Sequence, residues 1–268
     1  MSVNFGIIGY GEVGQIFAAE LLANGAASVA TYDILFGSPP AAERIARARE
    51  LDVRIAESAE DAVSGADIVI SAVTADQARA VAFGAAACLK PGQIYLDINS
   101  ASPGTKIESS QKVDASGADF VEAAVMATVP GPGLKVPILG GGKRAVEAAQ
   151  TLNALGMNIT PVSEEVGRAS AMKLCRSIMI KGLEALTIQC REASQRWDVE
   201  DYVFDSLHRS YPQMDWRELA TKMRGRVSAH GVRRSAEMRE AAEMAQALGL
   251  DGSLCNGIAD VQAAFAGK

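Results

Sequence analysis

The sequence has few of the residues that mark metal-binding, disulfide-bonded or membrane proteins. Its four cysteines stand far apart without a CxxC pair, and only two histidines accompany them. We therefore predict neither a disulfide framework nor a metal site. No uncharged apolar run is long enough to cross a membrane. The first residues also lack a basic region before an apolar run, so we expect no secretion signal and a cytoplasmic location.

Aromatic residues and excess positive charge are scarce as well. Aromatic side chains make up 5% of the 268 residues, whereas apolar residues make up 49%. A chain of this length and composition can form two globular domains, each with its own core. The formal net charge of −6 argues against nucleic acid or an anionic membrane surface as a partner. We expect the partner to be a small-molecule substrate.

The sequence does contain a glycine-rich loop between a strand pattern and a helix pattern. An apolar run ends at Ile8, the loop follows, and helical periodicity begins at Gln15. In a dinucleotide site of this kind, the first glycine makes the turn, the second admits the pyrophosphate and the third lets helix pack on strand. The amides that open the helix then face the phosphates. The predicted cofactor-binding residues of the loop are Gly9, Gly11, Glu12, Val13 and Gly14.

An acidic residue, Asp33, ends the next predicted strand. A carboxylate at this place accepts both ribose hydroxyls of NAD and repels the additional phosphate of NADP. Arg44 and Arg47 lie in the following predicted helix and offer a contrary site for that 2′-phosphate. We predict NAD as the preferred cofactor and keep NADP as the alternative.

The first part of the chain alternates strand and helix patterns. Runs that are apolar at nearly every position are typical of a parallel sheet covered by helices on both faces. Their alternation with helical periods predicts a doubly wound α/β sheet of the Rossmann type. The predicted strands are Val3–Ile8, Ser28–Asp33, Val53–Ala56, Asp67–Val73, Ile94–Ile98, Phe120–Met126, Val136–Leu139 and Asn158–Val162.

From Glu164 onward the strand patterns end and helical patterns follow one another. We therefore predict a Rossmann-type domain at residues 1–163 and an all-α domain at residues 164–268, with a long helix as the joint. The predicted helices of the second domain are Glu164–Trp197, Val199–Arg209, Asp215–Met223, Arg226–Leu248 and Leu254–Phe265.

Polar or small residues follow three of the predicted strands, at the edge where doubly wound sheets bind ligands. We expect Val73, Thr74 and Asn99 to lie near the cofactor. The cluster that includes Asn99 and Ser100 either caps the next helix or also touches the nicotinamide ribose, and we predict Ser100 as a substrate-binding residue. The loop that begins Met126-Ala127-Thr128 is a candidate floor for a substrate pocket.

The long predicted helix carries a narrow polar stripe opposite a broad apolar side. Such a helix is expected to be buried among other elements, and the apolar surface of so small a domain predicts a homodimer formed through the helical domain. Lys173, on the stripe, either extends to solvent or lies in a cleft where it can transfer protons. The apolar side holds Met172, Cys175, Met179, Leu183, Leu186 and Cys190, and the stripe holds Lys173, Ser177, Glu184 and Arg191.

These residues together resemble the β-hydroxyacid dehydrogenases, a family that includes 3-hydroxyisobutyrate and 6-phosphogluconate dehydrogenases. The tail of the chain looks like a bacterial branch whose C-terminal domain differs from the main one. The resemblance is carried by the glycine loop, Asp33, Thr74, Asp97-Ile98-Asn99-Ser100 and Gly167-x-Ala169-x-x-x-Lys173.

The resemblance implies an enzyme that transfers hydride between a nicotinamide cofactor and a small 3-hydroxy acid or a related alcohol. Lys173 matches the catalytic lysine, and Ser177 stands where the family usually has asparagine. The run Met126-Ala127-Thr128 replaces the Ser-Gly-Gly that holds the substrate carboxylate. The basic residue of a late helix is displaced to Arg233 or Arg234, which either binds an anionic substrate or forms salt bridges on a solvated face.

Two other functions compete with a dehydrogenase. Imine reductases share the two-domain plan, but they usually carry aspartate or tyrosine where Lys173 stands. A cofactor-binding sensor without chemistry would need the glycine loop and would not need Lys173. The presence of both features favours an enzyme.

Overall fold

The computed structural model describes residues 3–268, and the chain divides into two compact units, one ending at Lys173 and the other beginning at Leu174. The boundary that we predicted after Ser163 precedes this division. The first residues of helix α7 (Arg168–Arg196) fall in the first unit because they are hydrogen-bonded to its sheet. None of the helices described in residues 3–268 is long and apolar enough to cross a membrane.

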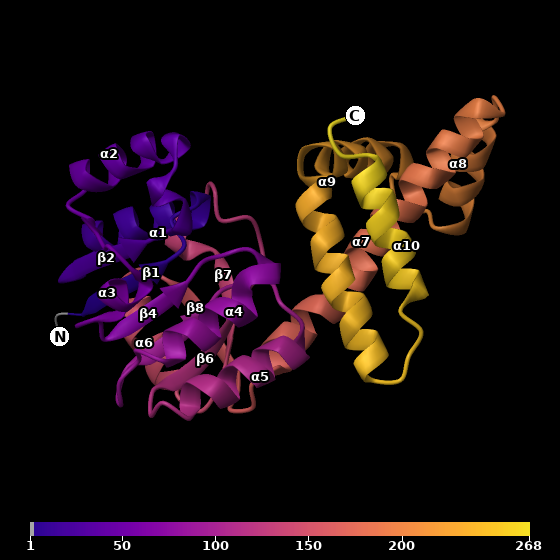
Figure 1. Ribbon diagram of the computed structural model, residues 1–268. Coiled ribbons are helices and arrows are strands. Elements are labelled where there is room, and N and C mark those ends of the chain that lie inside the picture. Colours follow the sequence, from indigo (N-terminus) through magenta and orange to yellow (C-terminus); the bar gives the residue numbers. More distant parts are fainter. Residues whose placement is uncertain (1–2) are drawn as a thin grey trace. The chain divides into compact units, whose positions relative to one another are not determined.

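The first unit is built on an eight-stranded sheet with the order β3-β2-β1-β4-β5-β6-β7-β8 (Figure 1). The first six strands along the chain run parallel, which confirms the predicted doubly wound sheet. Strand β7 runs antiparallel to β6, because the connection between them holds only a short 3-10 turn, η3 (Gly133–Lys135), and no crossover helix. The strands are β1 (Asn4–Ile8), β2 (Ser28–Tyr32), β3 (Arg54–Ile55), β4 (Ile68–Ser71), β5 (Ile94–Asp97), β6 (Asp119–Val125), β7 (Pro137–Gly141) and β8 (Asn158–Ser163).

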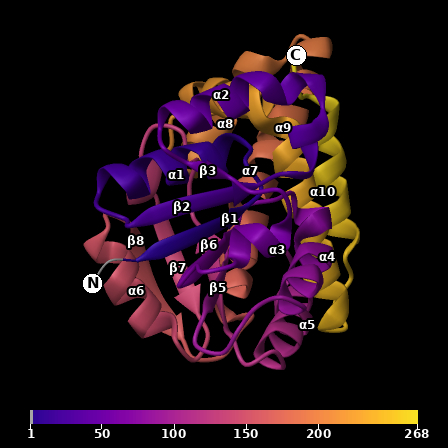
Figure 2. The same cartoon turned by 60° about the vertical axis from the view of Figure 1, so that its left-hand side comes forward.

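Helices cover both faces of this sheet (Figure 2). Alternate residues of a strand point to opposite faces, so Ile68 and Ile70 of β4 join one apolar core while Val69 joins the other. One core includes residues of α1 (Glu12–Ala23), α2 (Ala42–Glu50) and α6 (Ala145–Ala154). The opposite core includes residues of α3 (Ala59–Val63), α4 (Ala75–Ala86) and α5 (Pro103–Asp114).

The second unit is helical, as predicted. After α7 it contains α8 (Glu200–Ser210), α9 (Trp216–Ala247) and α10 (Ser253–Ala264), and α10 packs along α9 (Figure 1). The prediction of two helices, 215–223 and 226–248, was wrong, since α9 runs through Gly225 without a break. A glycine inside a helix costs only about 1 kcal/mol, which the packing of a long helix overrides.

Within a single chain, helix α7 buries most of its polar stripe and exposes much of its apolar side. Ser177 and Glu184 of the polar stripe are buried together with Lys181, whereas Met179 is 72% and Leu186 is 68% exposed. Much of the apolar side is therefore exposed in a single chain, and its burial against a second copy stays a prediction. The polar stripe is tolerated inside because its charged groups pair with charged groups of α9.

The start of α7 is held by a buried carboxylate on strand β6. Glu122 is fully buried, and its carboxylate accepts hydrogen bonds from the backbone N–H groups of Gly167 (2.7 Å), Ala169 (3.0 Å) and Ser170 (3.3 Å). The Ser170 hydroxyl also donates to it at 2.5 Å. A negative charge here satisfies N–H groups that lack helical partners and interacts favourably with the helix dipole.

We expect Glu122→Ala to lower the free energy of unfolding by about 3 kcal/mol or more, because three buried backbone N–H groups lose their acceptor. Urea denaturation measures this loss. The control is Glu165→Ala, which removes an exposed carboxylate paired with Arg168 near the same helix start and should cost no more than about 0.5 kcal/mol. Equal losses in the two variants would contradict the anchoring role of Glu122.

Candidate functional site

The glycine loop joins β1 to α1 in the geometry that a dinucleotide site requires. Gly9 has a positive φ of 97°, and a side chain there would collide with the carbonyl oxygen of Ala72. A side chain at Gly14 would collide with the carbonyl oxygen of Gly9. Around Gly11, in contrast, nothing lies within 4 Å of an added Cβ atom.

Gly9 and Gly14 are thus required by the packing of the protein itself, whereas Gly11 borders open space. Gly11 is also the N-cap of α1, and no side chain caps that helix start. The amides of the first turn, which include those of Glu12 and Val13, therefore suit an anionic ligand. These features fit the pyrophosphate of a dinucleotide.

Asp33 lies directly after β2 and binds the glycine loop. One oxygen of its carboxylate accepts the Tyr10 N–H at 2.7 Å, and the other accepts the Leu35 N–H at 2.9 Å, where a 3-10 turn begins. Each carboxylate oxygen can accept a second hydrogen bond. Asp33 is therefore held beside the loop with acceptor capacity left for a ribose hydroxyl.

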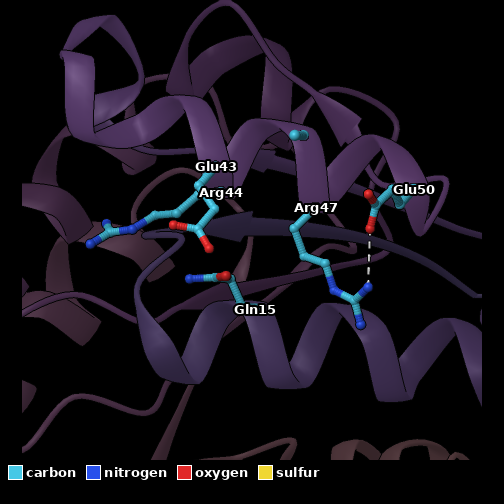
Figure 3. Close-up of a pocket in the computed structure, with 6 residues that line it drawn as sticks. Gln15, Glu43, Arg44, Arg47 and Glu50 are labelled. Atoms are coloured by element: carbon cyan, nitrogen blue, oxygen red, sulfur yellow. Dashed lines mark hydrogen bonds and ion pairs between the residues drawn. The ribbon is translucent and has the colours of Figure 1, made fainter.

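A cavity of about 550 Å³ lies between α1 and α2, and Figure 3 shows its side chains. Its charged groups balance, with Glu43 and Glu50 set against Arg44 and Arg47. The Arg47 guanidinium donates to Glu50 at 3.1 Å. The two arginines that could receive a 2′-phosphate are thus accompanied by two carboxylates that would repel it.

The ends of β4 and β5 are joined by a hydrogen-bonded asparagine. Asn99 accepts the Val73 N–H at 2.7 Å, and its side-chain amide donates to Ser71 at 2.9 Å and to Asp97 at 2.6 Å. The turn that carries Ser100 is therefore held in place by side chains of both strands. Asn99 is a structural link between the two strand ends, and any contact with a ribose stays a proposal.

Below this turn lies a buried ion pair. Lys106 of α5 is 3.0 Å from the carboxylate of Asp97, and its ammonium also donates to the Asp97 carbonyl at 3.0 Å. Burial and the negative charge of Asp97 raise the pKa of Tyr95 on β5, so this phenol stays protonated. A lysine and an aspartate this deeply buried are kept only as a pair.

Lys173 lies within hydrogen-bond distance of Ser100. The ammonium of this nearly buried lysine donates to the Ser100 hydroxyl at 2.5 Å. The structure therefore brings together a lysine of α7 and a serine from the β5 end, two residues that are distant in sequence. Because the parallel strands β1, β2, β4 and β5 end at the same edge, the glycine loop, Asp33 and Asn99 lie on that edge as well.

The remaining predicted site residues are placed as follows. Thr74 precedes α4 as its N-cap, and its side chain lowers the pKa of Asp76 by hydrogen bonding. Met126 follows β6 and is half-buried, while Ala127 and Thr128 are exposed and offer no charge. In the second unit, the Ser177 hydroxyl accepts a hydrogen bond from Lys181 at 3.0 Å.

Arg234 donates to the buried carboxylate of Glu184 and is itself mostly buried. A guanidinium already paired in this way does not need a substrate anion for charge balance. Arg234 thus forms a salt bridge, although on a buried rather than a solvated side of α9, and its contact with a substrate stays a prediction.

The sequence analysis did not predict a role for three charged residues that form these contacts. Glu122 had a visible signal, since it is a lone acid within the apolar run of β6. Lys106 and Lys181 had weaker signals, because a single lysine in a helix is usually exposed. Their burial depends on partners on other elements, Asp97 and Glu237, which no local pattern reveals.

Comparison with protein families gives two matches. Residues 4–163 match the NAD binding domain of 6-phosphogluconate dehydrogenase. Residues 194–265 match a domain of unknown function, DUF1932. An uncharacterized protein of Methanothermus fervidus is 28% identical over 205 residues, which is 76% of each chain.

Solved structures agree with these matches. A conserved hypothetical protein from Sinorhizobium meliloti 1021 is 40% identical, with a TM-score of 0.85 over 98% of this chain and 88% of that one. A conserved protein of unknown function, described as structurally similar to 3-hydroxyacid dehydrogenases, is 34% identical with a TM-score of 0.78 over 98% and 96%. The 3-hydroxyisobutyrate dehydrogenase of Mycobacterium tuberculosis, solved with L-serine, has a TM-score of 0.79 over 99% and 94% at 18% identity, which shows a shared fold.

Proposed function

We propose a function for this chain that starts from its family: it belongs to the proteins with the NAD binding domain of 6-phosphogluconate dehydrogenase. The proposed function is that of an NAD(P)-dependent oxidoreductase that acts on a small 3-hydroxy acid or a related alcohol. The observation that carries the proposal is the contact between Lys173 and Ser100 at the edge where the strands of a dinucleotide-binding sheet end. The resemblance of the sequence to β-hydroxyacid dehydrogenases gives the substrate class.

In the proposed reaction Lys173 is the general acid and base. Its amine accepts the proton of the substrate hydroxyl, while the bound nicotinamide supplies the acceptor for the hydride. Ser100 holds the Lys173 side chain in place, and the hydrogen bonds of Asn99 hold the turn that carries Ser100. The near-complete burial of Lys173 limits the access of water to the transferred proton.

A reductive aminase and an imine reductase from Aspergillus terreus share the fold with this chain at 16% and 17% sequence identity. Their likeness therefore does not choose between reduction of an imine and oxidation of an alcohol. Lys173 favours the alcohol, because transfer of the hydroxyl proton needs a base. A sensor without chemistry would have no use for a buried lysine at this place.

We expect Lys173→Ala to lower kcat by about 10²- to 10⁴-fold with NADH affinity nearly unchanged, since general acid–base catalysis contributes this much. The assay screens small 3-hydroxy acids with NAD, starting with 3-hydroxyisobutyrate and L-serine. Arg176→Ala removes an exposed cation from the same helix and is the control, with kcat close to that of the wild type. A kcat for Lys173→Ala within threefold of the wild type would reject this role, and a sensor would behave in that way.

We also propose that the cofactor is NAD in preference to NADP. The proposal is supported by the Asp33 carboxylate beside the glycine loop and by the balanced charges around Arg44 and Arg47. A phosphate bound between Arg44 and Arg47 would meet two carboxylates for two guanidinium groups.

Asp33→Asn removes a negative charge and keeps one acceptor for the backbone, so we expect the preference for NADH over NADPH to narrow by about tenfold, equivalent to 1.4 kcal/mol. Titration followed by nicotinamide fluorescence gives both affinities. Gly11→Ala is the control: its side chain would occupy the open space at the loop and weaken both cofactors to the same degree. An unchanged ratio in Asp33→Asn would mean that the acid does not contact the ribose.

We further propose that the exposed apolar side of α7 pairs with a second copy of the chain. Met179 and Leu186 are one heptad apart and exposed, and both would be buried away from solvent in a helix–helix interface. Light scattering should therefore give the mass of two chains, and the double variant Met179→Glu, Leu186→Glu should give the mass of one. Tyr202→Glu, at an exposed position of α8, is the control. A wild-type mass of one chain would contradict the proposal.

A further inference from the structure

We propose that Lys181 and Glu237 are positioning residues that orient the hydroxyl of Ser177 so that it donates a hydrogen bond to a substrate oxygen. This inference rests on the proposed function, because it assumes that Lys173 acts on the substrate. Ser177 follows Lys173 by one turn of α7, and residues at this spacing share one side of a helix.

The three side chains form a continuous hydrogen-bonded chain inside the second unit. The Lys181 ammonium donates to the Ser177 hydroxyl oxygen at 3.0 Å and to the Glu237 carboxylate at 2.8 Å. Ser177, Lys181 and Glu237 are all buried. Glu237 belongs to α9, so the contact ties the polar stripe of α7 to a second helix.

The donor to Ser177 decides what its hydroxyl can do. An ammonium group can only donate, so the Ser177 oxygen must act as the acceptor in this contact. Among the residues of the described range 3–268, none accepts the hydroxyl proton of Ser177. The hydroxyl is therefore left as a donor, and a substrate carbonyl or alkoxide oxygen is the acceptor that it suits. Without Lys181 the hydroxyl could rotate and act as either donor or acceptor.

The charge of Lys181 is costly to bury. Burial lowers the pKa of Lys181, the carboxylates of Glu237 and Glu184 oppose this shift, and the guanidinium of Arg234 adds to it. A buried ion pair often stabilises a protein no better than apolar side chains of the same size. The ion pair therefore contributes little as a device for stability alone, which supports a role in orienting Ser177.

The test is a double-mutant cycle of wild type, Ser177→Ala, Lys181→Met and the double variant, assayed with NAD and the 3-hydroxy acid of the panel that the wild type oxidises fastest. Ser177→Ala should lower kcat by about 10²-fold, the usual loss for one donor to a developing oxyanion, with KM nearly unchanged. Lys181→Met should lower kcat by about tenfold in the wild type and by less than about twofold when Ser177 is already Ala. Ser177→Thr keeps a hydroxyl and should recover most of the kcat.

Equal losses from Lys181→Met with and without Ser177 would overturn the proposal, because Lys181 would then act independently of the serine. Arg191→Met is the control. It breaks another ion pair of α7, in which the Arg191 guanidinium lies 3.0 Å from the Glu200 carboxylate, and it should leave kcat unchanged. If Lys181→Met does not fold, Ser177→Ala decides alone: a kcat within threefold of the wild type rejects the donor role.

A second readout needs neither cofactor nor substrate. In urea denaturation of the unliganded protein, the midpoint shift of the double variant should be smaller than the sum of the two single shifts, because the two side chains contact each other. Additive shifts would contradict the contact itself. Failure of the proposed function gives a different result, in which Lys173→Ala keeps full kcat or no 3-hydroxy acid is oxidised by the wild type, and this inference then falls with it.

Discussion

The carboxylate of Glu122 is the interaction on which the arrangement of the first unit depends. It lies in the middle of strand β6 and accepts hydrogen bonds from the N–H groups that open α7, so this helix begins at a defined place on the sheet. Ser170, which it binds, precedes Lys173 by less than one turn. The position of the lysine relative to Ser100 is therefore set by a carboxylate that touches neither residue.

Two pairs of buried opposite charges lie next to the residues of the proposed chemistry. Asp97 and Lys106 support the turn after β5, and Lys181 and Glu237 support Ser177. Each pair carries a desolvation cost that apolar side chains would avoid. Each pair also fixes the direction of the hydrogen bonds that it makes with its neighbours, because an ammonium always donates and a carboxylate accepts. Polar groups next to these pairs are thereby given a single role.

The sequence was sufficient for the fold and for the edge of the sheet that holds the candidate site. Periodicity gives the strands and helices, and glycine spacing gives the loop, because both depend on neighbouring residues. The confirmed sheet and the NAD-binding match follow from these local signals. The partners on α9 that bury the polar stripe of α7, the capping by Glu122 and the pairing of Lys106 depend on residues far apart in sequence, and local patterns could not predict them. The continuous helix through Gly225 was missed because a weak local breaker was given too much weight.

Helix α7 is shared between the two units: its first turns, with Lys173, belong to the sheet, and the rest belongs to the helical part. The residue proposed to move the proton is thus encoded with the nucleotide fold, while most of the helical surface is encoded downstream of it. Recombination or drift in the downstream segment can replace that surface and leave the lysine in register. The NAD-binding unit can in this way keep the lysine proposed as its base while the downstream helical segment changes.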